Sequence, residues 1–201
     1  MKAKKQSAVK VILIHGNGGG WPKENWLPPV AKKLSKLGIK VIFRRFPDPV
    51  LARAKYWLPF IKKLGADENT ILVGHSSGAV AAMRYVEKNE ILGSILVATC
   101  HTDLAEESER VSRYYDKPWN WDDIKKNQQW IVQFASVDDR FIPIKEARFV
   151  HKKLKTEYYE FKHQGHFSSW DKKVDFPQIV SIIKRKLKVW QKTQKTQKVS
   201  E

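Results

Sequence analysis

Short, continuous apolar runs alternate with longer stretches in which apolar residues recur at helical spacing. Continuous apolar runs are typical of strands buried on both faces of a parallel sheet. Helical spacing is clear in 49–64, where Ala54, Leu58 and Ile61 share one face. The predicted strands are 10–14, 40–46, 70–74, 94–98, 130–135 and 157–161, and the predicted helices are 28–37, 49–64, 77–89, 144–154 and 176–190.

This alternation predicts one α/β domain over residues 1–190, with a mainly parallel central sheet and helices on both faces. Residues 191–201 have no apolar periodicity, which predicts a flexible, polar and basic tail. Residues 101–129 interrupt the alternation and carry Trp119 and Trp121. This segment is interpreted either as a small lid or pocket wall, with both tryptophans lining a substrate pocket, or as a segment that they pin onto the domain.

The most informative motif is Gly-His-Ser-Ser-Gly at 74–78, which joins a predicted strand to a predicted helix. A Gly-x-Ser-x-Gly motif in that context is typical of a nucleophile elbow, where a strained turn exposes the serine. Ser76 is therefore the predicted nucleophile. Ser77 follows it at the start of the helix, where its backbone N–H can stabilise an oxyanion.

A serine nucleophile needs a base and an orienting acid, which follow it in the order acid, then histidine, in this kind of fold. Two strand ends downstream supply them. Asp139 begins an Asp-x-x-Ile-Pro run and is favoured as the acid over Asp138, which can instead accept hydrogen bonds from loop amides. His166 follows a glycine and is favoured as the base over His163.

A second oxyanion donor is expected in the glycine-rich loop 15–20 after the first strand, and the N–H of Asn17 is the first choice. The loop lacks the Gly-Lys-Ser/Thr ending of a phosphate cradle. Cys100 and His101 lie at another strand end, but adjacent residues on an extended chain point in opposite directions, so a Cys–His pair is disfavoured. No metal or organic cofactor is expected.

The composition shows an excess of cationic residues: the sequence has 38 Lys and Arg but 21 Asp and Glu, which gives a net charge of +17. Such a charge can recruit nucleic acid or an anionic membrane. The lysines recur along the whole chain, however, and a solvated basic surface is the favoured interpretation. The single cysteine excludes an intrachain disulfide, and no apolar run is long enough for a signal peptide or membrane span, so a soluble, cytoplasmic protein is expected.

Over residues 9–190 the sequence resembles the retinoblastoma-binding-protein-9-like serine hydrolases, a family of small α/β-hydrolases. The resemblance implies an α/β-hydrolase fold with a minimal lid, and Ser76, Asp139 and His166 as a catalytic triad. The vertebrate member's Leu-x-Cys-x-Glu motif for the retinoblastoma protein is not retained, because Ala66 replaces the cysteine. The segments that carry the resemblance are 16–20, 46–49, 57–60, 74–79, 82–85, 118–121, 138–139 and 165–167.

These observations predict a serine hydrolase that cleaves a small ester or amide through an acyl-enzyme. The alternative is a non-catalytic module that binds protein or nucleic acid on a hydrolase scaffold. Three residue types in the required order at successive strand ends favour the enzyme, because a pure binding protein has no need of them.

Overall fold

The computed structural model describes residues 8–19 and 25–199, so Gly20 of the predicted glycine-rich loop lies outside the described residues. Six strands form one sheet in the order β2-β1-β3-β4-β5-β6, and every neighbouring pair is parallel. The strands are β1 (Lys10–Ile14), β2 (Lys40–Phe43), β3 (Thr70–His75), β4 (Gly93–Val97), β5 (Ile131–Ser136) and β6 (Glu157–Phe161).

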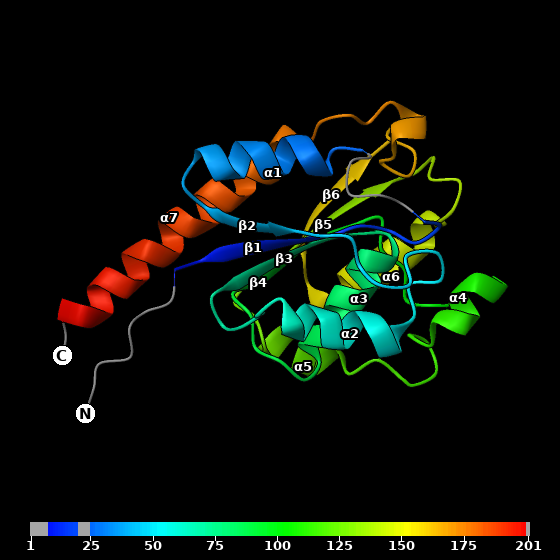
Figure 1. Ribbon diagram of the computed structural model, residues 1–201, viewed down its shortest axis with the longest axis horizontal. Helices are drawn as coiled ribbons and strands as arrows, with labels where there is room; N and C mark the ends of the chain where they lie inside the picture. The colour runs from blue at the N-terminus through cyan, green and yellow to red at the C-terminus, as the bar shows by residue number, and fades with distance from the viewer. Residues whose placement is uncertain (1–7, 20–24, 200–201) are drawn as a thin grey trace.

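Helices cover both faces of the sheet, as Figure 1 shows: α1 and α7 lie together on one face, and α2, α3 and α5 on the other. This is the arrangement of an α/β-hydrolase, and it confirms the predicted fold class. The helices are α1 (Leu27–Lys36), α2 (Ala54–Lys63), α3 (Ser77–Val86), α4 (Glu107–Ser112), α5 (Trp121–Lys126), α6 (Ile144–Leu154) and α7 (Pro177–Val199), with a 3₁₀ turn η1 (Ser169–Asp171).

The side on which successive strands are added changes at β1, because β2 lies to one side of β1 and all later strands lie to the other. The topological switch point is therefore between β1 and β3. Ligands in open parallel sheets bind outside the carboxyl ends of the strands at such a switch point. The glycine-rich loop after β1 and the Gly-x-Ser-x-Gly turn after β3 therefore flank the position where a site is expected.

The strands form where the apolar runs predict them, except that the strand predicted over 40–46 ends at Phe43. The helix predicted over 77–89 ends at Val86, and three further helical segments differ from the pattern. The helix predicted from residue 49 begins at Ala54, because Asp48 instead accepts hydrogen bonds from the N–H and the guanidinium of Arg53 and closes a turn. Residues 101–129 contain two six-residue helices, α4 and α5.

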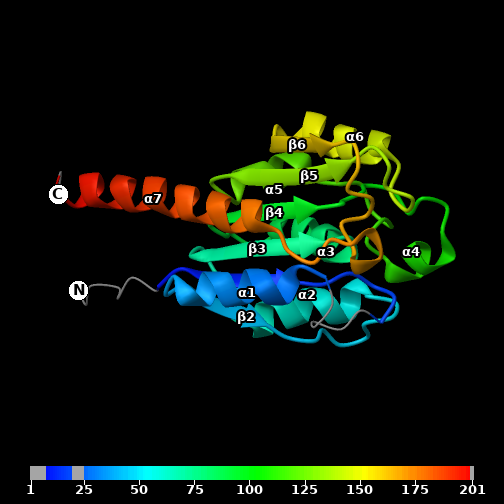
Figure 2. The same cartoon turned by 90° about the horizontal axis from the view of Figure 1, so that it is seen from above.

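The last helix, predicted to end at Trp190, continues to Val199. Lysine and glutamine are good helix formers, and no glycine or proline interrupts residues 191–199, so the helix continues there although this part of the sequence has no apolar periodicity. Its carboxyl-terminal part extends beyond the sheet, away from α4 (Figures 1 and 2). None of the described helices combines the length and apolarity that a bilayer crossing requires.

An aromatic cluster beneath the loop after β6 joins the sheet to α7. Phe134 of β5 packs against Tyr159 and Phe176, with ring centroids 5.0 Å and 4.8 Å away. Phe176 in turn stacks on Phe167, and the indole N–H of Trp26 donates to the Phe167 carbonyl at 3.0 Å. This cluster supports the loop that carries His166.

Because Phe134 is fully buried among these rings, Phe134→Ala is expected to lower the free energy of unfolding by about 3–5 kcal/mol. Urea denaturation followed by circular dichroism measures the change. The control is Val189→Ala at an exposed position of α7, which is expected to stay within about 0.5 kcal/mol of the original protein. Equal effects of the two substitutions would contradict the assignment of Phe134 to the core.

Candidate active site

Ser76 sits at the turn between β3 and α3 in a backbone conformation that few residues adopt, with φ 55° and ψ −124°. Its N–H donates to the carbonyl of Val97 on the neighbouring strand at 2.9 Å. The two glycines of the motif make the turn possible. A Cβ on Gly74 would lie 2.4 Å from the Gly78 carbonyl oxygen, and one on Gly78 would lie 2.5 Å from the carbonyl oxygens of Ile14 and His15.

The glycine-rich loop after β1 lies directly beside Ser76, since a Cβ on Gly16 would be 3.3 Å from the Ser76 Cβ. The N–H of Ser77 is at the first position of α3, where no preceding helical carbonyl is available to it. The N–H of Asn17 makes no backbone hydrogen bond within residues 8–19 and 25–199. Both predicted oxyanion donors therefore belong to segments that adjoin Ser76.

His166 and Asp139 meet at the same edge of the sheet. The Nδ1 atom of His166 lies 2.8 Å from Oδ2 and 3.0 Å from Oδ1 of Asp139. Their side chains are only 10% and 3% exposed, so this contact is largely shielded from water. The Asp139 carboxylate also accepts the N–H groups of Phe141 and Ile142, which fixes its orientation toward the imidazole.

Asp138 and His163, the alternatives to Asp139 and His166, have contacts outside the His166–Asp139 pair. Asp138 accepts hydrogen bonds from the Ser136 hydroxyl and from the Gly165 N–H, at 2.6 Å and 2.9 Å, and the Ser136 bond lowers the pKa of its carboxyl. It therefore braces the loop that carries His166. His163 is 88% exposed and lies 4.0 Å from Asp138.

The sequence reasoning did not single out two side chains that hold the backbone of His166. His75 Nε2 lies 2.8 Å from the His166 carbonyl oxygen. Burial lowers the pKa of His75 to about 3, so its imidazole is neutral and donates from Nε2. Asp171 accepts the His166 N–H at 3.0 Å, and its other oxygen contacts Arg140 of the acid loop. Both peptide groups that flank His166 are thereby held.

A sequence signal exists for Asp171 and is weaker for His75. Ser168 and Asp171 form the Ser-x-x-Asp pattern of a capping box, and the structure shows both of its hydrogen bonds. His75 occupies the variable second position of the elbow motif, and its partner lies 91 residues away. Spacing along the chain does not reveal that contact.

The predicted pocket residues Trp119 and Trp121 pack against each other and against the body of the domain. The Trp119 indole N–H donates to the His101 carbonyl at 2.8 Å, and the Arg84 guanidinium lies 3.6 Å from the Trp119 ring centroid. Arg84 also donates to the carbonyls of Tyr114 and Lys117. These contacts favour the interpretation that the tryptophans pin the insertion, and their pocket role stays a prediction.

The side chains of Cys100 and His101 have separate partners. The Cys100 thiol contacts the Tyr115 hydroxyl, and burial raises its pKa, which disfavours a thiolate nucleophile. The His101 imidazole lies against Glu146 and stacks on Phe149.

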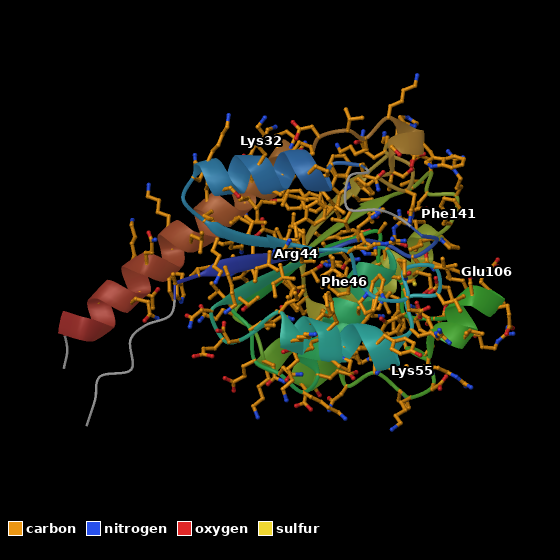
Figure 3. The ribbon with its side chains drawn as sticks, in the orientation of Figure 1. Lys32, Arg44, Phe46, Lys55, Glu106 and Phe141 are labelled. Atoms are coloured by element: carbon orange, nitrogen blue, oxygen red, sulfur yellow. The ribbon has the colours of Figure 1, made fainter. Side chains whose placement is uncertain are left out.

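An exposed aromatic ring borders the histidine. Phe141 is 60% exposed, and its ring centroid is 5.0 Å from that of His166. Figure 3 shows Phe141 at the end of the molecule where the strands finish, the end that also carries Glu106 at the start of the α4 segment. An apolar surface is therefore available beside the candidate base.

Comparison with known proteins identifies the fold and the family of this chain. The structure superposes on the ydeN gene product from B. subtilis with a TM-score of 0.82, at 23% identity and covering 90% of this chain and 100% of that chain. It superposes on Est1E from Butyrivibrio proteoclasticus with a TM-score of 0.65, at 15% identity, covering 94% and 90%. At such identities these matches show the fold, which is that of the α/β-hydrolases.

The sequence comparisons are more specific. A family model described as serine hydrolase matches residues 11–185. Serine hydrolase RBBP9 from Rattus norvegicus is 40% identical over 184 residues, which are 90% of this chain and 97% of that protein. The chain belongs to the RBBP9-like serine hydrolase family, as the sequence motifs predicted.

The geometry of the elbow yields a stability prediction. Gly78→Ala places a Cβ against carbonyl oxygens of β1 and of its following loop, so α3 must move and the variant is expected to lose about 1–3 kcal/mol of unfolding free energy. Thermal denaturation measures the loss. Gly18→Asn is the control, because a Cβ at Gly18 meets nothing within 4 Å and asparagine tolerates a positive φ. A larger loss of unfolding free energy in Gly18→Asn than in Gly78→Ala would contradict the prediction that the close backbone approach at Gly78 is important for stability.

Proposed function

We propose that this serine hydrolase cleaves a small ester or amide through an acyl-enzyme, with Ser76, Asp139 and His166 as its catalytic triad. The observation that carries the proposal is the shielded His166–Asp139 contact at the sheet edge where the strained Ser76 turn also lies. An acid that holds Nδ1 of the imidazole leaves Nε2 available as the base.

In the first half-reaction, His166 Nε2 takes the Ser76 hydroxyl proton as Oγ attacks the carbonyl carbon of the substrate. The N–H groups of Ser77 and Asn17 stabilise the oxyanion, and Asp139 stabilises the imidazolium. His166 then gives the proton to the leaving alcohol or amine as its bond to the acyl carbon breaks. His166 then takes a proton from water as the water oxygen attacks the acyl carbon, and it returns that proton to Ser76 Oγ as the bond between Oγ and the acyl carbon breaks and the acid leaves.

The small substrate size follows from the size of the insertion. Within residues 8–19 and 25–199, the segment 101–129 is an addition to the alternating pattern that contains two six-residue helices. Its second helix, α5, packs on the face of the sheet against α3 and α6, which leaves the part around α4 at the carboxyl ends of the strands (Figure 1). A segment of this size encloses little volume, which favours a small acyl group or leaving group over a long polymer.

A fluorophosphonate probe tests the nucleophile, because it reacts with activated serines. The wild-type protein is expected to be labelled with one adduct, and Ser76→Ala is expected to be unlabelled. Ser77→Ala is the matched comparison: it removes the neighbouring hydroxyl, keeps the backbone N–H, and is expected to be labelled still. Intact-protein mass spectrometry counts the adducts. An unlabelled wild type, or equal labelling of Ser76→Ala, would refute the proposal.

The acid is tested by two isosteric substitutions at adjacent positions. Asp139→Asn presents an amide to Nδ1 and favours the wrong imidazole tautomer, so kcat on p-nitrophenyl acetate is expected to fall by about 10³–10⁴-fold. Asp138→Asn alters only the loop contacts and is expected to lower kcat by less than about tenfold, because the hydrogen bond that it weakens is partly exposed to solvent. A larger loss for Asp138→Asn would reverse the assignment.

A further inference from the structure

The carboxylate of Glu109 connects the insertion to the loop after β1. Glu109 lies on α4 and is half-buried. Its Oε1 atom accepts a hydrogen bond from the side-chain amide of Asn17 at 2.8 Å, across a separation of 92 residues. Asn17 is the residue whose N–H is the predicted second oxyanion donor, so Glu109 holds that residue from the side of the insertion.

A buried polar chain supports the carboxylate from behind. The Tyr115 hydroxyl lies 3.1 Å from Glu109 Oε2, and the Cys100 sulfur lies 3.1 Å from the same hydroxyl. Burial raises the pKa of Cys100, so its thiol stays protonated and can donate to the tyrosine oxygen. Hydrogen bonds can then run from Cys100 to Tyr115 and from Tyr115 to Glu109. Burial raises the pKa of the Glu109 carboxyl, and the hydrogen bonds from Tyr115 and Asn17 oppose that rise.

The backbone on both sides of Asn17 is also held by other groups. His15 Nδ1 lies 2.6 Å from the Gly16 carbonyl oxygen, which belongs to the peptide group that carries the Asn17 N–H. The two residues that follow Asn17 are Gly18 and Gly19, with φ of 78° and 81°. Their N–H groups donate to the carbonyls of Val50 and Pro49, which anchors the far side of the loop. On the near side, the Asn17 side chain adds its contact with Glu109 to the contact of His15 with Gly16. A peptide N–H must be aimed within a narrow range of directions to stabilise an oxyanion.

We propose that Glu109 is a positioning residue of the oxyanion hole, acting through the side chain of Asn17; this inference rests on the proposed function of the same site. The insertion then completes the active site by fixing one of its two oxyanion donors. Glu109 touches neither the substrate nor the reacting atoms in this role. Its removal should therefore affect turnover more than substrate binding.

A double-mutant cycle tests the coupling. Glu109→Ala and Asn17→Ala each break the contact and leave the Asn17-position N–H in place. Each is expected to lower kcat on p-nitrophenyl acetate by about 10- to 100-fold, which is less than the 10²–10³-fold typical for complete loss of a donor, with KM changed less than about threefold. The kcat of the double variant is expected to be no lower than that of the more affected single variant, because both substitutions disrupt the same contact.

Two further variants separate positioning from a general structural role. Glu109→Gln keeps an acceptor oxygen for Asn17 and is expected to retain at least about a third of the wild-type kcat. It also keeps the test valid if the alanine variant does not fold. Glu107→Ala is the matched control, because Glu107 lies on the same short helix with a 73% exposed side chain paired to Arg110. Its kcat is expected to stay at the wild-type value.

The outcomes distinguish this inference from the proposed function. One outcome is that the fluorophosphonate labels wild-type Ser76 but the fold-losses of kcat in the two single variants multiply in the double variant. That outcome refutes the positioning role, and the serine hydrolase mechanism stands. The same holds if Glu109→Ala raises KM at unchanged kcat, or if Glu109→Gln is as slow as Glu109→Ala. A wild type that is neither labelled nor active refutes both.

Discussion

The backbone of α3 lies against the ends of β1 and β3 at a distance that only glycine tolerates. Gly74 and Gly78 remove the two side chains that would separate these elements, and the chain can then turn through the strained conformation of Ser76. Strain of this kind, about 1–3 kcal/mol, persists only where the surrounding packing fixes it. The fully buried strands β1 and β3 on either side provide that packing.

Around this turn, each loop is held by side chains from other parts of the chain. The backbone N–H of His166 is bound by Asp171 and its carbonyl by His75, while Asp138 holds the preceding glycine. Arg140 links Asp171 to the loop that carries Asp139. Because several contacts fix the same short loop, the backbone of His166 is already ordered, and holding its side chain in one orientation costs little further conformational entropy.

The basic charge is distributed unevenly relative to this site. The long helix α7 carries cations at Lys184, Arg185, Lys186, Lys188 and Lys192, and has no acidic residue of its own. Its protruding part lies away from α4 (Figure 2). Glu157 of β6 pairs with Arg185 and Lys186, so part of this charge is used within the fold. The cations on the protruding part of α7 are thus separated from the carboxyl ends of the strands (Figure 2), whereas other lysines recur along the rest of the chain.

The sequence by itself determined the six strands, the elbow and the order of serine, acid and histidine, because these depend on local apolar patterning and on the rule that parallel strands end at one edge. It could not determine the helices α4 and α5, which are too short to show a period, or the extension of α7, which has no apolar face to reveal it. The contacts of His75, Asp171 and Glu109 were decided only by the tertiary structure. The His75 and Glu109 partners lie 91 and 92 residues away, and no local spacing encodes which side chains meet when the loops of a sheet edge come together.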